Sequence, residues 1–450
     1  MNWLNKLNAL VAIAAIGCGG GANEAKAPPE AGAGMPGSAS SAGSDSGVAG
    51  ASGSNASGSA GSSRGGSPSG SMGGSAAGSV GLGSACKGAT PVCLKNTTRP
   101  GNAPALTTGA WLNISPPQVP FATVPNVFTQ GLATDPCDSS TLYLTISAFD
   151  IVAANAGIYK SVDAGSTWRH VSGLDEPIHI VVDPNDSNHL YAVDGVRGNS
   201  EGFWTSCDGG ESFYQTDGFK ALEKAESLFQ YDVYDIAVDP TDFNHILLAH
   251  HGAWGWTDTK WNTSSGVLES NDGGENWIVH PPMDGWGTGH AINFLYDPEL
   301  KIGDRNTWLL GTQGAGMYRT SDAGKTWKKV SEVGIQHGGG DIYYDKAGFV
   351  YASAASSIIM SKDNGATFSP VTLPVNGGFN TVFGDGTSVF LAPDFGNSHY
   401  YTSPEGDGVS WQQFSAQTFG SGPFSMGFDS ANNVLYSANW TDGMWAVKVR

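Results

Sequence analysis

The chain has 450 residues, of which 64 are glycine and only 14% are charged. Lys and Arg number 22 against 41 Asp and Glu, so the formal net charge at pH 7 is −19. Because contacts to phosphate need clustered Lys and Arg, this balance argues against nucleic acid or an anionic membrane surface as the electrostatic partner. An acidic surface that keeps the protein soluble is the simpler explanation.

The first residues have the features of an export signal. One Lys precedes an apolar run, Ala9 to Ile16, that is too short to cross a bilayer. The ending Ala15-Ile16-Gly17-Cys18 resembles the lipobox of bacterial lipoproteins. This resemblance implies removal of residues 1–17, lipidation of Cys18 and anchoring at the outer membrane or cell surface, so that the membrane is contacted only through the lipid. The alternative is an ordinary secretory signal with an incidental cysteine.

Residues 18–85 are almost entirely Gly, Ser and Ala with scattered Pro. Such a segment cannot bury enough apolar area to offset the entropy of ordering, so we expect a flexible tether with a reach of roughly 45 Å. A lead-in segment containing cysteine follows at 86–104. The folded domain is expected at 105–450.

Four cysteines remain after Cys18, namely Cys86, Cys93, Cys137 and Cys207. An even number in an exported chain favours disulfides, and four cysteines allow three pairings. We expect Cys86 to pair with Cys93 as a local loop, and Cys137 with Cys207 across adjacent repeats. The chain has no Cys-x-x-Cys pair, so neither a metal site nor another cofactor is predicted.

An eight-residue phrase returns along the chain. Its first copy, Ser161–Trp168, has the general form Ser/Thr-x-Asp-x-Gly-x-Thr/Ser/Asn-Trp/Phe. The Asp accepts hydrogen bonds from its own turn, the Gly supplies a positive φ, and the aromatic ring buries apolar area against a neighbouring element. We therefore expect a structural role for the Asp of every copy: Asp163, Asp208, Asp272, Asp322 and Asp363.

This phrase resembles the Asp box, or BNR repeat, of a family that includes sialidases, sortilin-type receptors, xyloglucan-degrading glycosidases and photosystem II assembly factors. The resemblance implies a β-propeller. Because these relatives share turns rather than chemistry, the function has to be argued from the site.

A second phrase, an apolar run ending at Asp, precedes the boxes and occurs seven times at spacings of 40 to 58 residues. Its acids are Asp135, Asp183, Asp239, Asp297, Asp345, Asp385 and Asp429. This period predicts an all-β, seven-bladed propeller of four-stranded antiparallel blades. The seventh unit ends without a box, and Thr108–Ser115 resembles the missing fourth strand, so we expect this N-terminal strand to complete the last blade and close the ring.

The residue four positions before each of these acids is small or polar, and the next residue is large and apolar. Alternation with a period of two predicts that the apolar set packs between blades and that the polar set points into the central channel. The polar set is Gly131, His179, Asp235, Asn293, Asp341, Thr381 and Ser425.

Long Gly-rich loops of blades two to four lie on the same side of the predicted ring and carry four Trp. Trp faces backed by polar groups suit sugar rings. The predicted ligand-binding residues are His179, His250, Trp254, Trp256, Asp258, Trp261, Asp284, Trp286 and His290. The alternative is that these Trp pack the loops onto the blades.

Glycoside hydrolysis needs two carboxyls facing one bond, and Asp235 with Asp341 is the pair at the channel mouth, with Asp258 and Asp284 as loop alternatives. Sialidase chemistry is not expected, because no arginine triad is present. A polysaccharide lyase would use His179 or His290 with a tyrosine. The xyloglucan-degrading relatives use a cleft between two propellers, whereas one propeller is predicted here.

The sequence therefore predicts an exported, surface-anchored, monomeric propeller that binds an extracellular glycan. Whether it is an enzyme stays open, with glycoside hydrolase as the enzymatic hypothesis. The alternative is a protein-binding scaffold or receptor without catalysis.

Overall fold

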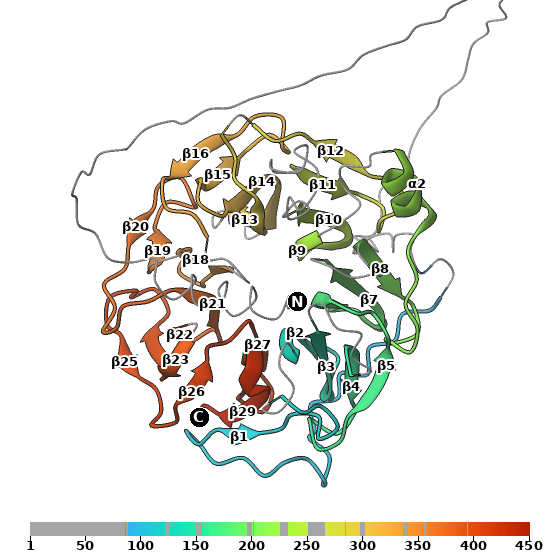
Figure 1. The fold of residues 1–450 in the computed structure, drawn as a ribbon, viewed down its shortest axis with the longest axis vertical. Helices are drawn as coiled ribbons and strands as arrows, with labels where there is room; N and C mark the ends of the chain where they lie inside the picture. The colour runs from blue at the N-terminus through green and yellow to red at the C-terminus, as the bar shows by residue number, and fades with distance from the viewer. Residues whose placement is uncertain are drawn as a thin grey trace, which may run out of the picture. The chain divides into compact units, whose positions relative to one another are not determined.

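The computed structural model describes residues 86, 89–121, 127–148, 155–195, 200, 202–225, 233–250, 266–283, 285–297, 302–335, 341–354, 357–393 and 395–450, and all statements below concern these residues. They belong to one compact unit, Ala77–Arg450. Antiparallel sheets surround a central axis in this unit and form the seven blades that the repeats predict (Figure 1).

The first four blades follow one another in chain order, and within each blade the strands follow one another outward from the inner strand. Blade 1 contains β2 (Val127–Asp135), β3 (Asp138–Ala148), β4 (Gly157–Ser161) and β5 (Arg169–Ser172). Blade 2 contains β6 (Pro177–Asp183), β7 (Asp186–Asp194) and β8 (Gly202–Ser206). Blade 3 contains β9 (Val233–Asp239), β10 (Asp242–His250), β11 (Val267–Ser270) and β12 (Ile278–His280). Blade 4 contains β13 (Gly289–Asp297), β14 (Ile302–Thr312), β15 (Gly316–Thr320) and β16 (Lys328–Ser331).

Three more blades complete the ring. Blade 5 contains β17 (Ile342–Tyr344), β18 (Val350–Ser353), β19 (Ile358–Ser361) and β20 (Ser369–Pro370). Blade 6 contains β21 (Phe379–Gly384), β22 (Ser388–Pro393), β24 (Tyr401–Pro404) and β25 (Gln412–Gln413). Blade 7 contains β27 (Ser425–Asp429), β28 (Val434–Ala438), β29 (Met444–Lys448) and, as its outer strand, β1 (Leu112–Asn113). A separate ribbon pairs β23 (Phe395–Ser398) with β26 (Phe419–Ser421).

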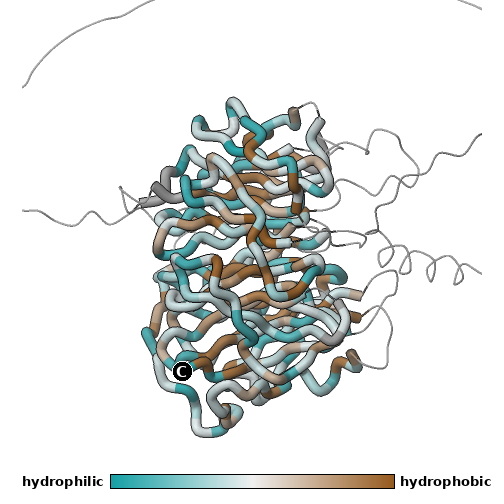
Figure 2. The backbone as a smooth tube through the Cα atoms, turned by 90° about the vertical axis from the view of Figure 1, so that its left-hand side faces the viewer, coloured by the Kyte–Doolittle hydropathy of each residue, from teal (hydrophilic) through white to brown (hydrophobic). Residues whose placement is uncertain are grey.

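The inner strands contact one another in the order β2, β6, β9, β13, β17, β21, β27 and back to β2. Apolar side chains fill the space between neighbouring blades, as in the cluster that joins Leu247 of blade 3 to Phe294 and Trp308 of blade 4. In the side view, hydrophobic stretches run through the middle of the strands and hydrophilic ones lie nearer their ends (Figure 2). The core is thus a series of inter-blade layers.

Two short helices accompany the described strands. Helix α2 (Asp217–Ala225) follows blade 2, and the Thr216 hydroxyl caps it by accepting a hydrogen bond from the Phe219 N–H (3.2 Å). Phe219 is fully buried and packs on Phe203 and Trp277, which fixes the helix to blades 2 and 3. The 3₁₀ helix η3 (Trp440–Asp442) connects β28 to β29. Among the described residues, no helix has the length and apolarity needed to cross a lipid bilayer.

The Asp boxes form the turns that their residues predict. In blade 1, Asp163 accepts hydrogen bonds from the Thr167 N–H (2.8 Å) and hydroxyl (2.7 Å), while the Ser161 hydroxyl accepts one from the Gly165 N–H (2.8 Å). Asp208, Asp272, Asp322 and Asp363 make the corresponding contacts. Burial opposes ionisation of Asp163, but these hydrogen bonds outweigh it and lower its pKa. The five acids are therefore turn residues.

Each box also touches the preceding blade. Gly274, at the fifth position of the blade 3 box, has φ +90°, and a Cβ there would lie 2.5 Å from the Phe203 ring of blade 2. The fifth position thus needs glycine both for its backbone conformation and for the close approach of the neighbouring blade. The fourth position also has a positive φ even where it is Ala164 (φ 56°) or Ala323 (φ 53°).

The N-terminal segment pairs with the C-terminal strand. In the sheet, Leu112 lies opposite Ala446 and Asn113 opposite Trp445. The Trp168 indole of blade 1 donates a hydrogen bond to the Ile114 carbonyl (2.7 Å), so the same segment also touches the first box. Its Trp111 ring is buried 4.6 Å from the Tyr400 ring. We therefore expect this segment to stabilise the closed ring.

The disulfide pairing expected from the sequence is wrong. Cys86 is bonded to Cys207, and Cys93 to Cys137. The physical reason is the course of the lead-in segment, which does not form a local loop but runs along the turns of blades 1 and 2. There the Val92 N–H donates to Asp186 (2.9 Å) and the Asn96 N–H donates to the Cys137 carbonyl (2.9 Å).

A sequence pattern shared by the third strands, as in Gly157–Tyr159 and Gly316–Tyr318, predicts the third strand of blade 6 at Ser398–Tyr400, and this prediction is wrong. The strand is β24, and Ser398 instead ends β23. Tyr400 is fully buried and its hydroxyl donates to Asn439 of the β28–β29 connection (2.9 Å). This inter-blade contact takes the place of the predicted pairing.

Candidate functional site

The predicted alternation along the inner strands is present. The large apolar residues that follow the polar set are all buried: Leu132, Ile180, Ile236, Phe294, Ile342, Val382 and Met426. In the polar set, His179, Asp235, Asn293, Asp341 and Ser425 keep partial exposure, whereas Gly131 and Thr381 are buried. Along the inner strands, the apolar residues are therefore buried, and most of the neighbouring polar residues are more accessible to solvent.

Several side chains of the polar set also bridge to the next blade, which the sequence did not predict. Asp235 of blade 3 accepts a hydrogen bond from the Ile292 N–H of blade 4 (2.8 Å). Asn293 of blade 4 donates to the Ile342 carbonyl of blade 5 (2.9 Å), and Ser425 of blade 7 accepts from the Leu132 N–H of blade 1 (3.2 Å). The reason is geometric, because both faces of an inner strand lie against neighbouring blades.

The two carboxyls of the predicted pair, Asp235 and Asp341, both have raised pKa values. Burial raises the pKa of Asp235 well above its ordinary value; the Ile292 N–H opposes this shift, and the Asp341 charge adds to it. Burial likewise raises the pKa of Asp341 to about 7, against the hydrogen bond from the Ile342 N–H. Both carboxyls of the predicted pair therefore hold protons at higher pH than ordinary carboxyls do.

His179 extends this polar region toward blade 2. Its Nε2 lies 3.7 Å from Asp235 Oδ1. Burial lowers the pKa of the imidazole to about 4, so His179 is neutral at neutral pH. A neutral imidazole can both donate and accept a hydrogen bond.

His250 and His290 lie at the ends of β10 and β13 that face the loops, and both are buried. The Tyr234 and His290 rings are 4.5 Å apart. Burial lowers the pKa of His250 to about 3. The tyrosine was missed in the sequence, although its position directly before Asp235 on the same inner strand was a usable signal. The structure thus places a tyrosine beside one of the two histidines named for lyase chemistry.

Trp286 is not an exposed platform for a sugar. It is buried, with its ring 5.3 Å from Tyr318 and 5.2 Å from Trp327. The packing alternative is therefore the observed one at this position, because its faces are taken up by other aromatic rings. The remaining predicted ligand residues lie outside the described residues: Trp254, Trp256, Asp258, Trp261 and Asp284.

A second polar group that the sequence analysis missed lies in blade 3, on the side of the Asp-Pro turns. His245 bridges Asp239 (Nδ1 to Oδ2, 3.2 Å) and Glu269 (Nε2 to Oε1, 3.0 Å), and Glu269 also contacts His280 (2.9 Å). The signal was a repeated Asp-x-Asn-His phrase, Asp186–His189 and Asp242–His245. His189 similarly contacts Asp183 (3.3 Å). In both blades, the His of this phrase therefore holds the Asp that ends the inner strand in place. In the described ranges, no three His, Cys, Asp or Glu residues are arranged to hold a metal ion.

No protein-family profile matches the chain. It is similar to a xyloglucanase of Hypocrea jecorina, with 24% identity over 292 residues that cover 53% of this chain and 32% of the relative. It is also similar to the xyloglucanase Xgh74A of Acetivibrio thermocellus, with 28% identity over 214 residues that cover 46% of this chain and 22% of the relative. The chain thus spans no more than 32% of the length of these two relatives.

Among solved structures, the GH74 xyloglucanase of Xanthomonas campestris aligns with a TM-score of 0.51 and 16% identity, covering 76% of this chain and 54% of that one. This likeness concerns the fold. Taken with the box turns at Asp163, Asp208, Asp272, Asp322 and Asp363 and with the ring of blades, it identifies the chain as an Asp-box β-propeller.

Proposed function

We propose that the propeller binds an extracellular polysaccharide at the loop-side end of its inner strands in blades 2 to 5. The observation that carries the proposal is the gathering of His179, Asp235, Tyr234 and His290 around the starts of β6, β9 and β13. Burial keeps the His179 imidazole neutral at neutral pH, so it presents both a hydrogen-bond donor and an acceptor. Such groups suit the hydroxyls of a sugar. The relatives named as xyloglucanases support a polysaccharide as the ligand class.

Hydrolysis is the finer part of this proposal. Asp341, whose pKa burial raises to about 7, would hold a proton at neutral pH and donate it to the glycosidic oxygen. Asp235 would supply the second carboxyl that glycosidases require. Because the acid must be protonated, turnover should fall as the pH rises through about 7.

The contacts of Asp235 favour a second candidate, a glycan-binding or protein-binding module without catalysis. Its two carboxyl oxygens accept N–H groups of Ile236 (2.8 Å) and Ile292 (2.8 Å). A group engaged in this way stabilises the joint between blades 3 and 4 whether or not it acts on a substrate.

A glycan array with the purified protein, followed by product analysis on each hit, separates these candidates. We expect binding to a polysaccharide that His179→Ala weakens, whereas Ser425→Ala, a change in the same polar set in blade 7, does not. A protein that binds no glycan on the array overturns the proposal. Binding without products supports the module that lacks catalysis.

We further propose that the protein is displayed on a lipid anchor at Cys18, which lies outside the described residues. Cys18→Ser should abolish incorporation of labelled fatty acid and release the protein from the membrane fraction. Retention of both in the variant contradicts the anchor.

A further inference from the structure

Blade 1 carries two cations opposite each other. Lys160 of β4 and Arg169 of β5 are cross-strand partners. Like charges in this position repel, but Glu211 of blade 2 contacts both, at 3.2 Å from Lys160 Nζ and 2.6 Å from an Arg169 guanidinium nitrogen. The hydrogen bond from Arg169 is the main cause of the lowered pKa of Glu211. This cation pair therefore holds one carboxylate between two blades.

Blade 4 repeats the cation pair without the carboxylate. Arg319 of β15 and Lys328 of β16 are again cross-strand partners. Glu211 is the sixth residue of the box in blade 2, and the sixth residue of the box in blade 5 is Ala366. Within the part of the chain that the structure describes, neither Arg319 nor Lys328 forms an ion pair, although the chain carries 41 acidic residues.

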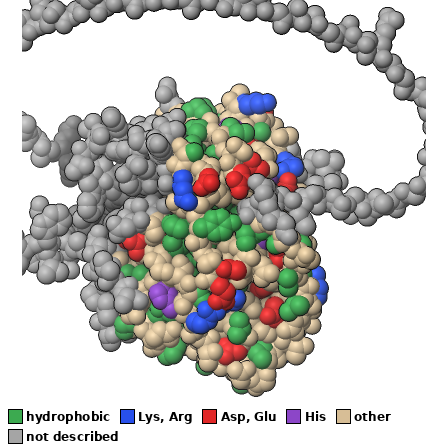
Figure 3. Space-filling model, turned by 90° about the vertical axis from the view of Figure 1, so that its right-hand side faces the viewer, with side chains coloured by type: hydrophobic (Ala, Val, Ile, Leu, Met, Phe, Trp, Pro, Cys, Tyr) green, Lys and Arg blue, Asp and Glu red, His purple; other side chains and the backbone are tan. Residues whose placement is uncertain are grey.

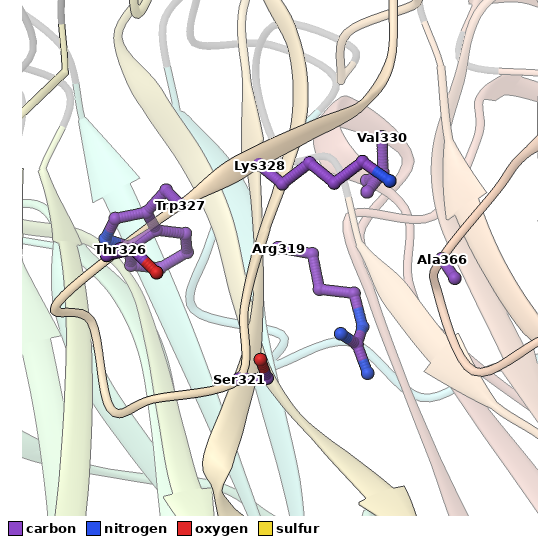
Figure 4. A pocket seen from close by; sticks show the side chains of 7 residues that line it. All are labelled: Arg319, Ser321, Thr326, Trp327, Lys328, Val330 and Ala366. Carbon is purple, nitrogen blue, oxygen red and sulfur yellow. The ribbon is translucent and has the colours of Figure 1, made fainter.

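A cavity of about 170 Å³ lies at this position, between blades 4 and 5. Arg319, Lys328 and the exposed residues Ser321 and Thr326 line it, and Ala366 forms its wall on blade 5. In the close view, the charged ends of Arg319 and Lys328 extend toward the side on which Ala366 lies (Figure 4). Arg319 is held in place by donating a hydrogen bond from Nε to the Asn364 carbonyl (3.1 Å).

The side of the molecule in Figure 3, seen at 90° to the view of Figure 1, offers a contrast, because acidic and basic side chains lie interspersed there among neutral ones. Among the residues that the structure describes, the cations of blade 4 have no acidic partner. Two cations held on one face of a sheet, next to hydroxyls and an open space, form a site for a planar anion that a guanidinium can contact with two parallel N–H groups.

We propose that this groove binds the carboxylate of an acidic sugar, a uronate, with Arg319 and Lys328 contacting the carboxylate and the Ser321 and Thr326 side chains contacting sugar hydroxyls. A carboxylate is favoured over a phosphate because blade 1 holds a carboxylate on the same cation pair. The cation pair itself indicates the carboxylate. The inference rests on the proposed polysaccharide function only in assigning that carboxylate to a sugar. The groove is formed by outer strands and Asp boxes, so it is separate from the inner-strand site.

Two matched variants test the proposal. Ala366→Glu places a carboxylate where blade 1 has Glu211, which should fill the site, whereas Ala366→Gln has the same size without the charge. With sodium glucuronate as the probe in calorimetry at low salt, we expect saturable binding by the native protein and a loss of at least about tenfold in affinity in Ala366→Glu, compared with a smaller loss in Ala366→Gln. Glu211→Ala should open the equivalent site in blade 1 and raise the stoichiometry.

Several outcomes overturn the proposal: no saturable glucuronate binding, binding unchanged in Ala366→Glu, equal affinity for glucuronate and acetate, or tighter binding of inorganic phosphate. Glucose, which lacks the carboxylate of glucuronate, should not bind at this site. Melting curves establish that each variant is folded. A neutral xyloglucan oligosaccharide should bind Ala366→Glu and the native protein with the same affinity. This control tests the proposed inner-strand site. A failure of the proposed function would therefore be distinguished from a failure of glucuronate binding in the groove.

Discussion

The Asp239–His245–Glu269–His280 group of blade 3 makes a stability prediction that depends on pH. His245 and Glu269 are buried, with side chains 2% and 8% exposed. Burial lowers the pKa of His245, but the hydrogen bonds that its ring donates to Asp239 and Glu269 outweigh this effect and raise that pKa above 6.5. Burial raises the pKa of Glu269, but hydrogen bonds from His245, His280 and Asn271 outweigh it and bring that pKa down to about 2. Both groups are therefore favoured in their charged forms.

The sign of each contribution follows from these shifts. The contribution of His245 is complete below its unfolded pKa of 6.5 and is lost as the pH rises through its higher folded pKa. The contribution of Glu269 is complete above its unfolded pKa of 4.5 and is lost as the pH falls toward about 2. The group therefore stabilises the fold most between pH 4.5 and 6.5.

Glu269→Gln keeps the shape of the side chain and removes its charge. Removing one partner of a buried ion pair costs about 3 to 5 kcal/mol, and we expect a loss near the lower end because His245 keeps its contact with Asp239 (3.2 Å). Urea unfolding at about pH 5.5 and about pH 8 measures the change in free energy. The loss should be larger at the lower pH, where His245 is charged, than at the higher pH. An equal loss at both pH values would refute the assignment of a charged His245.

Three further predictions concern the turns, the ring and the carboxyl pair. Asp272→Ala should lower the free energy of unfolding by about 1 to 3 kcal/mol through lost turn hydrogen bonds, with glycan affinity per folded molecule unchanged; unchanged melting with lost binding contradicts this. Deleting 105–115, which contains β1, should unfold the domain in thermal melts far more than deleting 19–84, and equal effects would contradict ring closure. Asp235→Asn and Asp341→Asn should each lower turnover by orders of magnitude with binding retained, and turnover that survives both changes ends the catalytic assignment.

The repeats made most of the fold predictable. Each Asp box is a local structure. In the first box, the side chain of Asp163 forms hydrogen bonds with Ser161 and Thr167, which lie within four positions, and with one more distant residue, Asn102. Local chemistry of this kind can be read from a short phrase, and its recurrence gives the number of blades. The apolar positions of the inner strands were predictable for the same reason, since alternation is a local property.

Features that depend on distant segments were not predictable in this way. The pairing of Cys93 with Cys137 depends on the path of the lead-in segment across two blades. The burial of Trp286 depends on Tyr318 and Trp327, which follow it by more than thirty residues in the chain. Composition near a Trp does not reveal which ring from another strand will cover its face.

Asp235 and Asp341 show how the structural and catalytic roles of such residues can be separated. Asp235 accepts N–H groups of its own blade and of the next, whereas Asp341 accepts that of Ile342. The Asn side chain has one acceptor oxygen, and its NH2 group can only donate. In Asp235→Asn this NH2 group would face the N–H of Ile236 or of Ile292, so one hydrogen bond is lost and the joint between blades 3 and 4 is destabilised. Asp341→Asn can keep its single hydrogen bond. If both carboxyls act on a substrate, the two variants should lose turnover alike while only Asp235→Asn melts earlier. If Asp235 serves the joint alone, its loss of stability should appear without a separate loss in turnover per folded molecule.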